Sequence, residues 1–332
     1  MSAILRTVQP TLSPQSLRID AAAEVGRITS NLREQVHFDL RRRGLVLGLS
    51  GGIDSSVSAA LAVRALGSNA VFALLMPEND SDPESLALGR RVAETFGIKW
   101  TVEDIGPILA AMDCYGRRDA AIRSIEPAYG PGWSCKVSIN SPLEGESYAI
   151  SMLVLQAPDG TMSRHRLPAA IYLAIIAATN MKQRTRKQME YYHADRLNYA
   201  VLGTPNRLEY DQGFFVKNGD GAADVKPIAH LYKSQVYQLA EYLGVPEDIC
   251  RRPPTTDTWS LAQTQEEFYF SLPHDRMDLC LYAMNEKISV EETAGATGLS
   301  AVQVERVWQD IRSKRKATRP LHLAPLLVED VF

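Results

Sequence analysis

Residues 45–67, LVLGLSGGIDSSVSAALAVRALG, place two glycines, an aspartate and several serines between two apolar stretches. A glycine pair at the end of a buried strand, followed at once by a helix, leaves backbone N–H groups free to face an anion. The hydroxyls of Ser50, Ser55 and Ser56 add donors, whereas Asp54 adds a negative charge that would repel phosphate. A Mg²⁺ ion between Asp54 and phosphate oxygens removes this conflict. The alternative is a tight strand-to-helix turn in which Asp54 only caps the helix.

A second group of polar residues lies later in the chain. Glu209 follows the loop residue Thr204 by five positions and could supply a second carboxylate to the metal; the alternative is a surface glutamate on a helix. Lys217, Asp220 and Asp224 lie in VKNGDGAAD, a glycine-rich stretch in which the charges are spaced too irregularly for one helix face. Such a stretch predicts a ligand-binding loop rather than part of the core.

The elements that must hold these residues alternate between strand and helix. Apolar positions at helical spacing predict an amphipathic helix over 17–43, and the apolar run 44–50 predicts a first strand covered on both faces. Further elements are predicted at 54–66 (helix), 69–77 (strand), a helix ending near 96, 99–105 (strand) and 168–197 (helix). This order is typical of an α/β fold with a doubly wound parallel sheet and a site at the carboxyl ends of the strands.

The pattern breaks over 113–166, where glycine and proline interrupt it and SYAISMLVLQAPDG predicts a β-hairpin arm. We expect one domain, 1–332, in which 113–166 is an insertion. The C-terminal tail, 285–332, is predicted to be helical, because Ser289 and Ser300 each precede a helical pattern as N-caps.

Composition narrows the classes of function. The 332 residues are 45% hydrophobic and 23% charged, and the formal charge of −3 gives no basic field that would attract nucleic acid. Four cysteines without CxxC spacing and the lack of a signal-peptide pattern indicate a cytoplasmic protein. The longest apolar stretch, 167–178, is shorter than the roughly 18 residues of a membrane span and suits a buried helix.

The SGGIDS run resembles the SGGxDS loop of the N-type ATP pyrophosphatases, which cleave ATP between the α- and β-phosphates. Residues 180–257 are similar to the second half of the NAD synthetases, and the resemblance covers roughly 30–105 and 178–320. Those enzymes adenylate the nicotinate carboxylate of deamido-NAD and let ammonia displace AMP. The resemblance implies an adenine nucleotide alpha hydrolase-like fold, a homodimer, a Mg²⁺ cofactor, and ATP as co-substrate.

The resemblance also implies a role for individual residues. The predicted ATP contacts are Gly48, Leu49, Ser50, Gly51, Gly52, Ile53, Asp54, Ser55, Thr204, Lys233 and Thr255. The predicted contacts to the acid are Arg184, Lys217, Asp224, Ser313 and Lys314. Mg²⁺ would be held by Asp54 and Glu209, and the catalytic residues would be Asp54, Lys217 and Asp220.

Charge dictates the mechanism that this resemblance implies. A carboxylate that attacks the α-phosphate meets a polyanion, and the metal, the loop N–H groups and Lys233 would offset the repulsion. No side-chain nucleophile is needed, so we interpret the four cysteines as structural. We expect ammonia to come free or from a separate glutaminase.

Several departures from the family pattern fall where the acid would bind. The family's PTADL stands here as PTTDT, its QTDE-like run as QTQEE, and the histidine of its C-terminal basic pair as Ser313. Three functions are therefore compatible with the sequence: an ammonia-dependent NAD synthetase, a ligase that amidates another carboxylic acid by the same chemistry, and a catalytically silent nucleotide-binding protein.

Overall fold

A four-stranded parallel sheet forms the centre of the molecule. The computed structural model describes residues 12–139, 151–255, 258–329 and 331. The strand order is β3-β2-β1-β7, with bounds Lys99–Val102, Val71–Leu75, Leu45–Gly48 and Ala200–Val201 respectively. In the register of the sheet, Leu45 lies opposite both Val71 and Ala200. Because all four strands are parallel, their carboxyl ends share one edge, as the doubly wound prediction requires.

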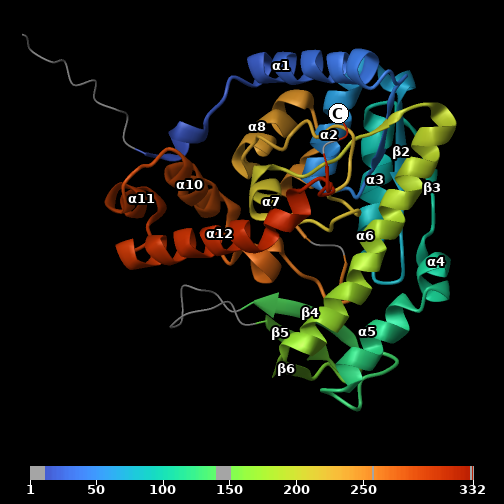
Figure 1. The fold of residues 1–332 in the computed structure, drawn as a ribbon, viewed down its shortest axis with the longest axis vertical. Coiled ribbons are helices and arrows are strands. Elements are labelled where there is room, and N and C mark those ends of the chain that lie inside the picture. The colour runs from blue at the N-terminus through green and yellow to red at the C-terminus, as the bar shows by residue number, and fades with distance from the viewer. Residues whose placement is uncertain (1–11, 140–150, 256–257, 330, 332) are drawn as a thin grey trace, which may run out of the picture.

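Helices cover both faces of this sheet, which confirms the predicted fold class (Figure 1). Leu45 and Leu47 belong to the largest core cluster, whereas Val46 belongs to a second cluster with Ala194 on the opposite face. The continuous apolar run of β1 is therefore explained by burial on both faces. The helices of the first face are α1 (Ala21–Glu34), α2 (Ile53–Leu66), α3 (Pro83–Thr95) and α8 (Lys233–Leu243), and the second face carries α6 (Ala169–Leu197).

The N-terminal helix is shorter than predicted. A 3-10 turn, η1 (Pro14–Leu17), precedes it, and the Asp20 side chain accepts a hydrogen bond of 3.0 Å from the N–H of Ala23 where α1 begins. A π-helical turn, η2 (Gln35–Asp39), ends it, and Arg41 follows with a φ of 52°. The apolar periodicity continues across both breaks, so it could not reveal them, whereas the cap and the left-handed residue do.

The described residues of the segment 113–166 form a small α/β unit beside α6. Helix α5 (Cys114–Arg123) packs on α6, and the predicted hairpin is present, with the N–H of Ala157 donating to the carbonyl of Thr161 at 2.9 Å. A further strand pairs with this hairpin, so the arm is a three-stranded antiparallel sheet. Its strands are β4 (Ser134–Ile139), β5 (Ser151–Gln156) and β6 (Met162–Arg166). The part of the predicted arm at 140–150 lies outside the described residues.

The predicted C-terminal helical tail is present as far as His322, whereas residues 323–329 are neither helix nor strand. Ser289 Oγ accepts from the N–H of Glu292 and Ser300 Oγ accepts from the N–H of Gln303, both at 3.2 Å, which confirms the two caps. The remaining elements are η3 (Ser68–Ala70), α4 (Gly106–Ala111), α7 (Arg207–Gln212), α9 (Glu247–Arg251), η4 (Glu266–Phe270), α10 (His274–Asn285), α11 (Val290–Thr297) and α12 (Ala301–His322). Within the described ranges, none of these helices has the length and hydropathy needed to cross a membrane.

Candidate active site

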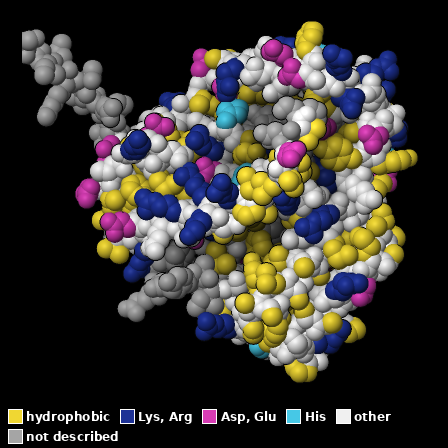
Figure 2. Space-filling model, in the orientation of Figure 1, with side chains coloured by type: hydrophobic (Ala, Val, Ile, Leu, Met, Phe, Trp, Pro, Cys, Tyr) yellow, Lys and Arg dark blue, Asp and Glu magenta, His cyan; other side chains and the backbone are white. Residues whose placement is uncertain are grey.

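A cavity of about 860 Å³ lies at the carboxyl ends of β1, β2 and β7. Figure 2 shows a hollow in the middle of this face, beside Lys and Arg side chains gathered over α12. The cavity brings together most of the residues predicted from the sequence. Those that line it are Gly48, Leu49, Ser50, Gly52, Ile53, Asp54, Ser55, Thr204, Glu209, Asp220, Lys233, Thr255, Ser313 and Lys314.

The glycine loop points the N-terminus of α2 into this cavity. Gly52 is the N-cap of α2, and its N–H donates to Ser50 Oγ at 3.2 Å. Gly51 is not among the described lining residues, but it has a φ of 75°, and a Cβ there would lie 2.6 Å from the Cβ of Leu88. Gly51 is therefore required for the turn and for the close approach of α3. A helix N-terminus at the cavity wall favours a bound anion.

Asp54, Glu209 and Lys233 form a charged group on one wall of the cavity. Lys233 is 1% exposed, and its ammonium contacts Asp54 Oδ2. Asn206 links the two carboxylates, because its Nδ2 donates to Asp54 Oδ1 at 3.1 Å and its backbone N–H donates to Glu209 Oε2 at 3.1 Å. Gln265 Nε2 donates to the other oxygen of Glu209 at 2.8 Å. Three segments far apart in the chain thus converge on one point.

Burial decides the protonation of this group. Burial, with the charge of Asp54 added to it, raises the pKa of Glu209 well above its ordinary value. Burial alone would lower the pKa of Lys233, but the charges of Asp54 and Glu209 outweigh it and raise that pKa. Lys233 is therefore a fixed cation that balances one of two adjacent carboxylates.

The donor set fits a divalent cation shared with phosphate. Asp54 and Glu209 both line the cavity, and Mg²⁺ in proteins is held by one or two carboxylates together with substrate phosphates. In the described parts of the chain, no group of three or more His, Cys, Asp or Glu residues could hold a metal by itself. The two carboxylates would accordingly need phosphate oxygens or water to complete the coordination.

A carboxylate that the sequence did not reveal fixes the helix that carries Lys233. Asp278 of α10 is fully buried, and its carboxylate accepts from the backbone N–H groups of Lys233 at 3.2 Å and Ser234 at 2.7 Å. It also accepts from Ser234 Oγ at 2.7 Å. Burial raises the pKa of Asp278 to about 6. Asp278 therefore caps α8 from another helix, which no local capping pattern could predict.

Three of the residues predicted to contact the acid lie outside the described lining. Arg184 is exposed, and its Nε donates to the carbonyl of Lys217 at 3.2 Å. Lys217 is also exposed, and its Nζ donates to the carbonyl of Pro320 at 2.9 Å. Asp224 accepts from the N–H of Val201 at 2.7 Å, so it holds the end of β7.

The C-terminal helix α12 supplies the other two, Ser313 and Lys314, to the cavity wall. Lys314 Nζ donates to the carbonyl of Tyr269 at 2.6 Å and pairs with Asp310 at 2.6 Å. Burial lowers the pKa of Lys314. Ser313 is exposed in this position, so it is free to face a bound molecule.

An aromatic wall was not anticipated from the sequence. Phe214, Phe268 and Tyr269 line the cavity together with Trp259, and the rings of Phe214 and Tyr269 stack with centroids 4.7 Å apart. Among the described residues, the buried Nε1 of Trp259 has no hydrogen-bond partner. These residues are scattered along the sequence without a common spacing, so only the fold brings them together.

Comparison with known proteins places these features in a family. A family model described as NAD synthase matches residues 24–124 and 152–320. The NH(3)-dependent NAD(+) synthetase of Rhizobium rhizogenes is 74% identical over 326 residues, covering 98% of each chain. That of Rhizobium meliloti is 69% identical over 319 residues, covering 96% of this chain and 95% of its own.

Solved structures agree on the fold. The NMN synthetase from Francisella tularensis has a TM-score of 0.64 at 22% identity, covering 95% of this chain and 100% of its own. The NH3-dependent NAD synthetase from Campylobacter jejuni has a TM-score of 0.60 at 22% identity, covering 94% of this chain and 100% of its own. From the matched model and the two highly identical relatives, the chain belongs to the NAD synthase family.

Proposed function

We propose that this chain is an ATP-dependent amide-forming ligase that converts deamido-NAD and ammonia to NAD. It would adenylate the nicotinate carboxylate with release of pyrophosphate, and ammonia would then displace AMP. The observation that carries this proposal is the convergence of Asp54, Glu209 and Lys233 at the helix N-terminus that lines the cavity. The relatives that are 74% and 69% identical are NH(3)-dependent NAD(+) synthetases, which supports deamido-NAD as the acid and ammonia as the amine.

The geometry of the site suits a triphosphate. The N-terminus of α2 and the loop that precedes it offer backbone dipole and hydroxyl groups to phosphate oxygens. Asp54 and Glu209 would hold a Mg²⁺ ion, which would supply positive charge to the phosphates when bound. Lys233 keeps the adjacent carboxylates oriented and adds a cation beside the leaving pyrophosphate.

The acid would extend from the phosphates toward residues on both sides of the cavity rim. Asp220, Ser313 and Lys314 lie on its wall, whereas Arg184, Lys217 and Asp224 lie beyond the described lining. In this proposal, Lys217 and Asp220 act close to the reacting carboxylate, and Arg184 and Asp224 hold the rest of the acid.

Assembly and ammonia supply complete the proposal. We propose a homodimer to which α6 contributes, because Leu173 on that helix is 62% exposed. Ammonia would enter from solution or from a separate glutaminase, since this chemistry needs no side-chain nucleophile. All four cysteines are free thiols, which supports a reducing, cytoplasmic setting.

Pyrophosphate release tests the function directly. The purified protein is incubated with ATP, Mg²⁺ and an ammonium salt, with deamido-NAD, with nicotinate mononucleotide, or without an acid. We expect pyrophosphate and NAD in equal amounts when deamido-NAD is the acid, and neither product in the other two incubations. Faster turnover of nicotinate mononucleotide would assign a different acid, and no pyrophosphate with any acid would contradict ligase activity.

A further inference from the structure

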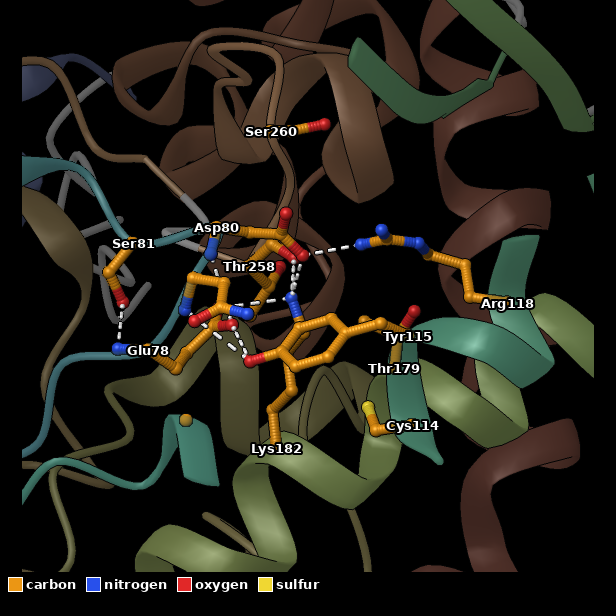
Figure 3. Close-up of polar contacts among 12 residues, drawn as sticks. Glu78, Asp80, Ser81, Cys114, Tyr115, Arg118, Thr179, Lys182, Thr258 and Ser260 are labelled. Atoms are coloured by element: carbon orange, nitrogen blue, oxygen red, sulfur yellow. Dashed lines mark hydrogen bonds and ion pairs between the residues drawn. The ribbon is translucent and has the colours of Figure 1, made fainter. Parts of the chain in front are cut away.

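A second group of charged side chains, joined by one tyrosine, lies next to the cavity, and Figure 3 shows the contacts among them. We call it the buried ionic cluster, and it comprises Glu78, Asp80, Tyr115, Arg118 and Lys182. Its members come from the loop after β2, from α5 and from α6. The sequence indicated no role for any of them.

Lys182 is the centre of this cluster. Its side chain is 1% exposed, and its ammonium donates to Glu78 Oε1 at 3.0 Å, to Asp80 Oδ2 at 2.5 Å and to the carbonyl of Thr258 at 2.8 Å. All three donors of the ammonium are therefore used. A buried cation with a complete set of partners is held in one place, because any displacement leaves a charge uncompensated.

Arg118 supplies the second cation, from α5. Its guanidinium pairs with Asp80 and donates to Asp119 at 2.9 Å. Burial acts to raise the pKa of Asp80, but the charges of Lys182 and Arg118 outweigh it and leave that pKa below its ordinary value. Asp80 thus stays ionised between two cations, one from each helix.

Tyr115, also on α5, reaches the same loop. Its hydroxyl donates to Glu78 Oε2 at 2.9 Å and accepts from the N–H of Asn79 at 3.4 Å. Burial and the Glu78 carboxylate raise the pKa of Tyr115, so the hydroxyl keeps its proton and remains a donor. Helix α5 therefore holds both the side chains and the backbone of this loop.

The loop held in this way is part of the cavity wall. Glu78 and Ser81 line the cavity, as does Thr258, whose carbonyl accepts from Lys182. Because β1 and β2 are neighbours in the sheet, the loop after β2 lies beside the glycine loop after β1. A shift of the loop after β2 would therefore change the shape of the cavity next to the glycine loop.

We propose that α5 positions the loop 77–82 for nucleotide binding, and that Arg118 and Tyr115 are the positioning residues that do so. This inference rests on the proposed function in one respect, namely that the cavity binds ATP. It gives the 113–166 segment a role in the site although neither Arg118 nor Tyr115 is among the described lining residues.

The test compares two arginines on one helix. Arg118 is buried in the cluster, whereas Arg117 is exposed, so R118M and R117M make the same chemical change in different surroundings. R118K keeps the charge, and Y115F removes only the hydroxyl. Binding of α,β-methylene-ATP with Mg²⁺ is measured by calorimetry, with thermal unfolding of each variant and the KM values of ATP and acid measured alongside.

We expect the dissociation constant of the analogue to rise about tenfold in R118M and about threefold in Y115F, with R118K between R118M and the wild type. R117M should bind like the wild type. The KM of ATP should rise in Y115F while the KM of the acid stays constant, which a loss of stability alone would not produce.

Different results would contradict the positioning role, the proposed function or both. If Y115F and R118K are folded and bind the analogue like the wild type, the positioning role is wrong, whatever the enzyme does with deamido-NAD. If the wild type binds the analogue but amidates no acid, the proposed function is wrong and the binding comparison still decides the role of α5. A wild type that binds no analogue contradicts both.

Discussion

The ammonium of Lys233 lies against the carboxylate of Asp54, 179 positions earlier in the chain, at the point where α2 enters the cavity. Glu209 lies beside them, and its pKa is raised by burial and by the charge of Asp54. The raised pKa favours the protonated form of Glu209 beside the Asp54–Lys233 ion pair. A cation bound next to Glu209 would favour its ionised form instead.

Asp54→Asn should lower kcat/KM for NAD formation by at least about a hundredfold, because the amide removes a negative charge that a metal would require. The Asp54 side chain is 15% exposed and pairs with the buried ammonium of Lys233, so the loss of its charge should also lower the thermal midpoint. The measurement is pyrophosphate release, with melting of the same sample. Asp159→Asn, in the exposed turn between β5 and β6, is the matched control. Undiminished turnover of Asp54→Asn would remove Asp54 from the metal site.

Arg184→Ala should raise the KM of the acid by about tenfold and leave the KM of ATP near its original value. Arg184 lies on α6 outside the described lining of the cavity, and its Nε donates to the carbonyl of Lys217. Initial rates with each substrate varied in turn separate the two constants. If only the KM of ATP rose, the assignment of Arg184 to the acid rather than to ATP would be incorrect.

Gly51→Ala should destabilise the fold by about 1–3 kcal/mol, because the left-handed φ and the contact with Leu88 both oppose a side chain. Gly26 in α1 is the control, since a Cβ there meets nothing within 4 Å. Gly26→Ala should stabilise the protein by about 0.5–1 kcal/mol. Denaturant unfolding measures both. Equal effects at the two positions would contradict the packing of α3 on the loop.

The free energy of unfolding should depend on pH through Asp278. Its pKa in the folded state is about 6, above the ordinary value of 3.8, so the folded state binds a proton that the unfolded state releases. By linkage, this group makes stability fall as pH rises from about 4 to about 6. The difference in unfolding free energy between wild type and Asp278→Asn should shrink over that range. A difference that grows with pH would contradict the burial of this carboxylate.

Much of the α/β core could be predicted because its signals are local. The apolar run of β1, the glycines after it and the serine caps of the last two helices each act within a few residues. The family resemblance assigned residues 48–55 and Glu209 to one site. The structure places Glu209 and all of residues 48–55 except Gly51 on the wall of one cavity.

The rest depends on contacts between distant segments. Lys182 looks like an ordinary helical lysine in the sequence, and only the tertiary fold shows that it is 1% exposed with partners 104 and 102 positions away. Asp278 caps a helix 44 residues earlier, where no capping pattern includes it. Arg184 shows the converse. The family resemblance predicts that it contacts the acid, whereas its side chain is exposed in the structure of the single chain.

The hydrogen bonds of Asn206 have a consequence for redesign of this protein. Its side chain and backbone begin α7 through a capping box with Glu209, and the same side chain donates to Asp54. Asn206 therefore fixes both the start of α7 and the orientation of the Asp54 carboxylate. Inserting or deleting a single residue between positions 206 and 209 would turn the glutamate by about 100° around the helix. Loop grafts into this scaffold should therefore keep those four residues together as a unit.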